Sequence, residues 1–303
     1  MDEQGPSGPR SGERRHAPGR ERGWEESWSF DFVSEGGAYG GFVRLALRPA
    51  DGRAWYWAYL VRPGRPVVVV RDHDVELPRG RELEVRGDGL WAQVICETPL
   101  DHWSAGLEAS AVAIDDPARA WGDERGDPVA LGLDLEWEMQ APPQALGDPD
   151  GYVQPATVHG EVLLGPERLS VDGTGWYTHA WGRPGWQDAQ WWDLKARLGD
   201  GTATAADGSG QAWIWSHGAT TAVAGAATMD TSWGPDGLPL VADIVVGDPG
   251  ASGPGLPVTP VALAPVPLDG AGGRLGVLVR ALCTFGPGPS EGSGWTEWRQ
   301  PIR

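Results

Sequence analysis

The 303-residue sequence has two cysteines, a single lysine and no long apolar run. Because no stretch approaches about 18 apolar residues, the sequence argues against a membrane-spanning helix. No apolar segment of the secretory type is visible near the N-terminus, so we expect a cytoplasmic protein. Cys96 and Cys283 lie far apart in apolar, strand-like segments. We expect two buried free thiols of a reducing compartment, with a disulfide between them as the alternative.

Positive charge is also scarce, and the formal net charge is −18 at pH 7. Nucleic acids and anionic membranes bind to basic surfaces, so we expect neither as a partner. The negative charge favours solubility. The sequence leaves the oligomeric state open.

Familiar catalytic and cofactor motifs are missing from the sequence. It has no Gly-x-Ser-x-Gly nucleophile motif, and its glycine pairs lack the helix and lysine that follow a phosphate-binding loop. It also has no His-x-His, His-Glu-x-x-His or paired Cys-x-x-Cys spacing. We therefore expect no cofactor and no dedicated zinc site.

Glycine, proline and tryptophan are abundant instead, with 46, 27 and 18 residues. Frequent glycine and proline predict many short strands joined by turns, and no long helical periodicity is visible. The expected strands cover residues 29–31, 40–47, 54–61, 67–70, 83–85, 90–96, 106–114, 131–139, 152–164, 168–172, 175–181, 191–198, 202–206, 211–216, 220–226, 238–246, 258–265 and 274–285.

The spacing of these strands predicts an all-β protein with two consecutive antiparallel β-barrels or sandwiches packed side by side. Residues 1–22 are rich in Gly, Pro, Arg and Glu, which predicts a disordered tail. Residues 141–151 have the composition of a linker. The expected domains are therefore 23–140 and 152–303.

Residues 54–61 carry large side chains on both faces of the predicted strand. Trp57 and Tyr59 share one face, and Tyr56 and Leu60 share the other. Such a strand is buried on both sides, or it lines a cavity on one of them.

Residues 173–182 are the most informative segment for function. In a strand, Tyr177, His179 and Trp181 face one way, whereas Trp176 and Thr178 face the other. An imidazole between aromatic rings can act as a general acid or base, because its reference pKa lies near 6.5. The alternative is a core histidine in an aromatic-rich sheet, and the sequence favours neither interpretation over the other.

Residues 211–217 repeat the pattern of two aromatic residues followed by a histidine. Trp213, Trp215 and His217 share one face of the predicted strand. If both segments face one cavity, two imidazoles line it. His217 in a turn at the strand end is an equally good alternative.

Two polar clusters offer weaker candidates. Glu97 and His102 lie in a segment that could form a proton relay, but a turn fixed by side-chain hydrogen bonds is favoured there. Asp188, just before Trp192, could orient His179. A solvated loop is the safer interpretation of that segment.

From about Trp24 onward, the sequence resembles the tandem lipocalin-like family of bacterial carotenoid 1,2-hydratase (hydroxyneurosporene synthase). Fungal lipocalin-like Diels–Alderases are more distant relatives, and two-domain actinobacterial members are the most similar. The resemblance rests on Trp57-Ala-Tyr59, Trp91-Ala-x-x-x-Cys-Glu-Thr-Pro99, Asp101-His-Trp103, Gly106-Leu-Glu108, His159-Gly160, His179-Ala-Trp-Gly182 and Gly294-Trp-Thr-Glu-Trp298.

One departure from the family affects the expected chemistry. The family box reads Asp-His-x-Trp-Gly, and Thr178 occupies the Asp position here. In the hydratase, the resemblance implies that this acid protonates an alkene. Its loss puts hydration in doubt, whereas a cyclase or isomerase that works mainly by restraining its substrate remains consistent with the sequence.

We expect a cofactor-independent biosynthetic enzyme that cyclises, isomerises or hydrates C=C bonds of a hydrophobic terpenoid, polyene or polyketide-like substrate. A carrier for a lipid or steroid-like ligand is the first alternative, and a structural module is the second. The expected catalytic residues are His179, Tyr177 and His217. The expected substrate-binding residues are Trp57, Tyr59, Trp176, Thr178, Trp181, Trp192, Trp213, Trp215, Glu97 and His102.

Overall fold

The structure is a computed structural model that describes residues 13–21, 23–121, 125–146, 150–184, 191–216, 219–222, 226–247, 255–270, 273–286 and 292–300. These residues form twenty β-strands and three short 3-10 helices, Glu35–Gly37, Pro49–Asp51 and Pro117–Trp121. The described residues contain no α-helix, and hence none long and apolar enough to cross a membrane. The prediction of an all-β chain is confirmed.

The first sheet closes into an antiparallel barrel. Its path runs β4-β3-β2-β1-β11-β10-β8-β7, and β4 pairs again with β7, while β5, β6 and β9 extend it. Closure leaves no free edges along the ring. The strands are β1 (Glu25–Ser34), β2 (Gly40–Arg48), β3 (Arg53–Val61), β4 (Val67–Glu76), β5 (Leu83–Gly87), β6 (Leu90–Thr98), β7 (His102–Ile114), β8 (Asp127–Met139), β9 (Gln144–Leu146), β10 (Asp150–Leu164) and β11 (Glu167–Gly182).

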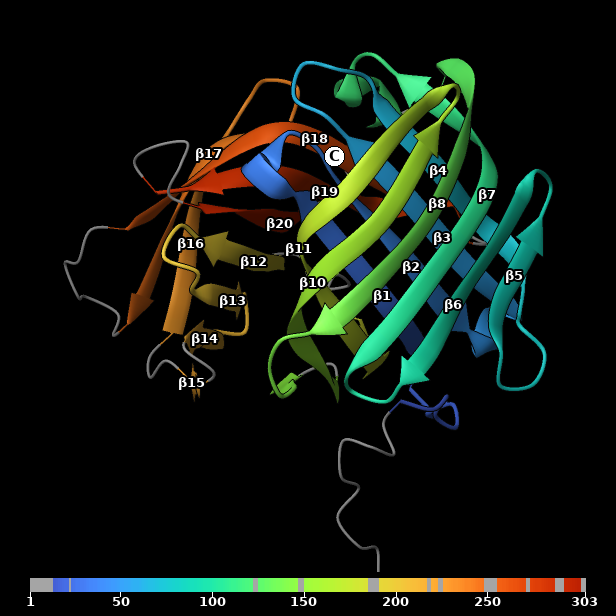
Figure 1. Ribbon diagram of the computed structural model, residues 1–303, viewed down its shortest axis with the longest axis horizontal. Coiled ribbons are helices and arrows are strands. Elements are labelled where there is room, and N and C mark those ends of the chain that lie inside the picture. Colours follow the sequence, from blue (N-terminus) through green and yellow to red (C-terminus); the bar gives the residue numbers. More distant parts are fainter. Residues whose placement is uncertain are drawn as a thin grey trace, which may run out of the picture.

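The second sheet is also antiparallel and curls against the side of the barrel (Figure 1). Its order is β15-β14-β13-β12-β20-β19-β18-β17-β16. The two curled sheets fit the expected lipocalin-like architecture. The strands are β12 (Trp192–Leu198), β13 (Ala203–Asp207), β14 (Ala212–Ser216), β15 (Ala219–Ala222), β16 (Ala226–Trp233), β17 (Pro239–Gly247), β18 (Leu256–Gly270), β19 (Gly273–Phe285) and β20 (Gly292–Gln300).

Strand β3 shows why the barrel and the second sheet pack together. Tyr56 and Leu60 enter the barrel core. Trp57 and Tyr59 lie on the opposite face, in a second core with side chains of β18, β19 and β20. The predicted burial of both faces of this strand is confirmed, and the outer face of the barrel is therefore an internal surface of the molecule.

The strand pairing corrects the expected linker at residues 141–151. This segment contains β9 and the start of β10, and both strands belong to the first sheet. Strand β10 pairs with β8 on one side and β11 on the other, so its hydrogen-bonded edges hold it in the barrel. The change from the first sheet to the second falls between β11 and β12, well after the predicted linker.

The expected disordered tail also needs correction, because residues 13–21 pack against the barrel. Glu13 is buried at the barrel end, although its segment is polar. The Arg15 guanidinium donates to the backbone oxygens of Pro78 and Gly80 at 3.0 and 2.6 Å. Figure 1 shows this dark blue segment lying under the lower end of the barrel. Hydrogen bonds help to hold the segment, which has no large aliphatic side chain.

Most predicted strands are present, with three additions. Strands β9, β16 and β20 were not expected, and the two segments expected at 168–172 and 175–181 form one continuous strand, β11. Cys96 is a partly buried free thiol and Cys283 a fully buried one, so the expected pair of free thiols is confirmed.

Candidate active site between the two sheets

A cavity of about 110 Å³ lies between the barrel and the second sheet. The pleat of β1 directs alternate side chains out of the barrel, so Ser27, Ser29 and Asp31 line this cavity. Thr178 lines it from β11, because it lies directly opposite Ser29 in the β1–β11 pair. The barrel therefore contributes a polar wall.

The second sheet supplies a charged wall. Arg280, Glu297, Asp193 and Asp207 lie opposite one another in consecutive strand pairs across β19, β20, β12 and β13. All four side chains line the cavity, together with Lys195. Directly opposite residues share a face of the sheet, so the register alone produces this row.

Asp31 is a buried acid of the barrel wall, with 4% of its surface exposed. Glu25, a second buried acid of this wall, forms ion pairs with Arg44 and Arg48. Oδ2 of Asp31 lies 3.4 Å from Nη2 of Arg280. Its Oδ1 has no hydrogen-bond partner among the described residues. Burial raises the pKa of the Asp31 carboxyl to about 6, against the opposing attraction of Arg280. Asp31 is therefore an acid that can hold a proton near neutral pH.

Besides its contact with Asp31, Arg280 is fixed in position by an ion pair and an aromatic ring. Its Nε lies 2.8 Å from Oε2 of Glu297, and its guanidinium carbon lies 4.0 Å from the centre of the Phe42 ring. Burial raises the pKa of Glu297, although the charge of Arg280 opposes that shift. The guanidinium thus presents a fixed positive charge beside Asp31.

Lys195 adds a second cation to the charged wall. Its Nζ lies 2.5 Å from Oδ1 of Asp193, which precedes it on the same face of β12. Burial also raises the pKa of Asp207. Three acidic and two basic side chains of the second sheet lie together here, so the cavity can bind a polar group of a substrate and exchange protons with it.

A larger cavity of about 820 Å³ lies further along the same faces of β1 and β19. Val33 and Leu282 line it, each two residues beyond the cavity-lining Asp31 and Arg280. Drug-sized ligands occupy roughly 300–1,000 Å³. The smaller cavity alone is below that range, whereas the larger one is within it.

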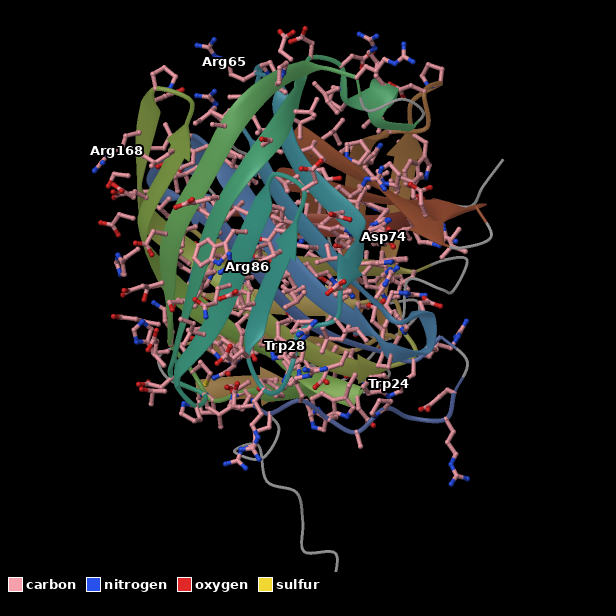
Figure 2. The ribbon with its side chains drawn as sticks, turned by 90° about the vertical axis from the view of Figure 1, so that its right-hand side faces the viewer. Trp24, Trp28, Arg65, Asp74, Arg86 and Arg168 are labelled. Carbon is pink, nitrogen blue, oxygen red and sulfur yellow. The ribbon has the colours of Figure 1, made fainter. Side chains whose placement is uncertain are left out.

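His179 lies on the other face of β11 from Thr178 and does not line either cavity. It is fully buried, with Nε2 3.0 Å from Oε1 of Glu26. Its ring stacks on Trp28, which Figure 2 shows at the lower end of the barrel. These contacts agree with the alternative of a core histidine in an aromatic-rich sheet, and the strand alternation separates this imidazole from the charged cavity.

Tyr177 shares the inner face with His179. Its hydroxyl donates to Oε2 of Glu13 at 3.2 Å, and the Tyr152 hydroxyl lies 3.5 Å away. Burial raises the pKa of Tyr177 well above its ordinary value. Burial likewise raises the pKa of Glu13, although its hydrogen bonds from Tyr152 and the Leu100 backbone oppose this.

The predicted tryptophans are divided among several places. Trp176, Trp213 and Trp215 meet in one small core on the same side of the barrel as Thr178, so these three are together but away from His179. Trp181 reaches both regions, since it lines the cavity and packs against the barrel core. Trp192 packs in a separate core of the second sheet.

The remaining predicted site residues contact other side chains of the protein and line neither cavity. Trp57 donates from Nε1 to Nε2 of His73 at 2.7 Å, and Tyr59 stacks on Phe42. Exposed Glu97 accepts from Ser104, so it does not join a buried relay. His102 lies 3.5 Å from Glu136.

Two predicted residues lie outside the described residues, namely His217 and Asp188. The turn at 98–101 agrees with the alternative favoured for the Glu97 segment, because the Asp101 backbone N–H donates to the Thr98 oxygen at 3.1 Å.

Sequence reasoning missed Asp31, Arg280 and Lys195. Asp31 stands in an alternating strand at a position that should face solvent, and Arg280 and Lys195 interrupt otherwise apolar strands. A charge inside an apolar strand is a usable signal, because such strands bury charges only when the charges are paired.

Comparisons with known proteins place the chain by family and fold. The model of the family described as Domain of unknown function (DUF7064) matches residues 9–302. A search of curated proteins finds no match to this chain.

Several solved structures share the fold. Kievitone hydratase from Nectria haematococca is 11% identical with a TM-score of 0.57, covering 91% of this chain and 88% of its own. A protein assigned as an AttH from Nitrosomonas europaea is 14% identical with a TM-score of 0.56, covering 92% and 93%. CghA is 11% identical with a TM-score of 0.50, covering 92% and 88%. At these identities the similarity concerns the fold.

Proposed function

Because the chain belongs to the family described as Domain of unknown function (DUF7064), we propose its function from its own cavity. We propose that it is a hydratase, isomerase or cyclase that protonates a C=C bond or an attached oxygen through Asp31. The observation that carries the proposal is a buried carboxyl that lines a cavity and leaves one oxygen without a hydrogen-bond partner. A buried carboxyl oxygen without a hydrogen-bond partner is costly, and acids with a shifted pKa cluster at functional sites.

The position of Asp31 allows it to replace the Asp of the family box, whose place Thr178 occupies in this chain. Asp31 and Thr178 line the same cavity from neighbouring strands, and their Cα atoms are diagonal neighbours, about 7–8 Å apart in such a pair. An acid at either position can reach the same bound group. We propose that Asp31 supplies the proton that the Asp of the family box supplies in the hydratase.

The chemistry of hydration balances with this acid alone. The carboxyl proton of Asp31 goes to one alkene carbon, and the other carbon becomes cationic. A water molecule then adds to the cation and returns a proton to the carboxylate. If a neighbouring C–H proton passes to the carboxylate instead, the product is an isomer. If an internal C=C bond attacks the cation, a ring forms with a new cationic carbon, which then loses a proton to the carboxylate or adds water. Asp193 and Glu297 can stabilise the cationic centre, because both line the cavity.

We propose a hydrophobic substrate with one polar end, of the terpenoid, polyene or polyketide-like class. Arg280 and Lys195 fit an oxygen-bearing group in the smaller cavity, and the larger cavity has room for an apolar portion. A hydratase among the proteins of similar fold supports this class of reaction.

A screen in heavy water tests the proposal. The protein is incubated with a panel of terpenoid, polyene and polyketide-like alkenes in D₂O, and products are analysed by chromatography and mass spectrometry. Protonation at carbon leaves one deuterium in an isomer, and hydration adds one molecule of D₂O. Saturable binding of panel members without any product would identify a carrier and overturn the enzyme proposal.

Variants then test the acid itself. Asp31→Asn should lower turnover about 10²–10⁴-fold, the usual contribution of a general acid, while substrate binding persists. Asp134→Asn removes an exposed acid of β8 and should leave turnover unchanged. Adding Thr178→Asp to Asp31→Asn should restore part of the activity. Full turnover by Asp31→Asn would refute the role of Asp31.

A further inference from the structure

His16, Glu26 and His179 converge at the end of the barrel where residues 13–21 pack. One ligand-type atom of each lies within 4.8 Å of the other two. Nδ1 of His16 is 2.8 Å and Nε2 of His179 is 3.0 Å from the same oxygen, Oε1 of Glu26. This trio is separate from the cavity between the sheets, and neither cavity is lined by any of its members.

We propose that His16, Glu26 and His179 form a zinc-binding site that fastens the N-terminal segment to the barrel. Two imidazoles and a carboxylate, with one position left for water, are a common zinc ligand set. Zinc bonds of 2.0–2.2 Å place tetrahedral ligand atoms roughly 3.3–3.5 Å apart. The present separations of 2.8 and 3.0 Å lie within about 1 Å of that arrangement.

The surroundings hold these groups in an orientation suited to a metal. Nδ1 of His179 lies 3.4 Å from the Tyr152 hydroxyl. With zinc bound, a hydrogen bond from Nδ1 to that oxygen would leave Nε2 unprotonated, as a ligand requires. The backbone N–H of His16 donates to both oxygens of Glu26 at 3.0 Å, which fixes the carboxylate.

Aromatic rings fix both imidazoles. The His16 ring stacks on Trp181 at 3.9 Å, and the His179 ring stacks on Trp28 at 4.6 Å. His179 and Glu26 are almost fully buried, whereas the His16 side chain is 28% exposed. The site is thus rigid on the barrel side and reachable by a metal ion from the His16 side.

The charge of the trio also suits a divalent cation. Glu26 carries the only formal charge when both imidazoles are neutral, so the site has one negative charge. An ionised carboxylate and neutral imidazoles are the forms of these side chains that bind a metal ion.

Calorimetric titration of the EDTA-treated full chain with zinc chloride tests the site. We expect one zinc per chain with a Kd below about 1 µM. His16→Gln should weaken binding at least about 100-fold, because it removes a ligand at the exposed side. His159→Gln is the matched control, since it removes a histidine that is 49% exposed on β10, and it should bind zinc as the wild type does.

Trypsin supplies a second readout that does not depend on enzyme activity. Arg14, Arg15 and Arg20 lie in or next to the fastened segment. Zinc should slow cleavage after these residues in the wild type and in His159→Gln, but not in His16→Gln. Absence of a 1:1 complex with the wild type, or equal zinc affinity of His16→Gln, would overturn the proposal. Either result leaves the role of Asp31 untouched.

Discussion

Asp31 owes its chemical character to two features of its position. An outward-facing side chain on a barrel strand normally meets water, but the second sheet covers this one. Burial then raises the pKa of the carboxyl to about 6, from an ordinary value of 3.8. Arg280 lowers the cost of ionisation without removing it. The same carboxyl is therefore a usable acid and a source of instability at high pH.

The raised pKa of Asp31 predicts a pH-dependent difference in stability. The native state binds the Asp31 proton more tightly than the unfolded state does. Protonated Asp31 therefore adds to the free energy of unfolding, and this added stability is fully present below pH 3.8 and is lost as the pH rises through about 6. The shift corresponds to about 3 kcal/mol. Between pH 4 and pH 8, the free energy of unfolding of the wild type should fall by about that amount relative to Asp31→Asn. Urea titrations at several pH values measure this difference, and a constant difference would contradict the assignment.

The contact between β1 and β11 depends on a glycine. A Cβ on Gly175 would lie 2.0 Å from the backbone oxygen of Asp31 and 2.7 Å from a methyl of Val158. No rearrangement of a flexible side chain can relieve a clash with backbone. Gly175 therefore permits the close strand pair that presents Asp31 to the cavity.

Gly175→Ala should lower the free energy of unfolding by about 1–3 kcal/mol or more, because it overpacks the strand pair. Gly132→Ala in β8 is the matched control, since its Cβ would lie 3.5 Å from the nearest atom. The control should change stability by less than about 0.5 kcal/mol. Denaturant unfolding of both variants makes the comparison, and equal stability of the two would contradict the close contact.

Alternation along single elements was the part of the structure that the sequence could predict. It assigned the faces of β3 and separated Tyr177 and His179 from Thr178 and Trp176. It could not predict which neighbour each face of β11 contacts, so it could not decide between a cavity and the barrel core for His179. The site depends on the pairings of β1 with β11 and of β12 with β20. Such pairings join residues about a hundred or more positions apart and leave no local pattern.

The barrel order explains why the predicted linker was misplaced. Residues 141–151 have the glycine and proline content of a loop, yet β9 and β10 return the chain to the first sheet. Amino-acid composition indicates where turns lie, but it does not indicate which sheet the following strand joins. Likewise, nothing in residues 13–21 predicted packing, because hydrogen bonds and the stacking of His16 on Trp181 hold them in place of large aliphatic side chains.

At the scale of the whole molecule, the two sheets share one core. Barrel side chains of β2 and β3 meet β18, β19 and β20 across this core, which includes Leu268 and Trp295. Separation of the sheets would expose this apolar surface to water, at a cost of about 25 cal/mol per Å². We therefore expect the barrel and the second sheet to unfold together.

Leu268→Ala tests this coupling from the second sheet. Leu268 is fully buried in the shared core, and its truncation should cost about 2–5 kcal/mol. The calorimetric transition should remain single and shift as a whole, because the barrel loses its cover when the second sheet unfolds. Leu240→Ala, on a residue of β17 that is 59% exposed, should leave the transition within about 0.5 kcal/mol of the wild type. Two resolved transitions, with only one moved by Leu268→Ala, would show that the sheets fold independently and that the cavity between them can open without unfolding either.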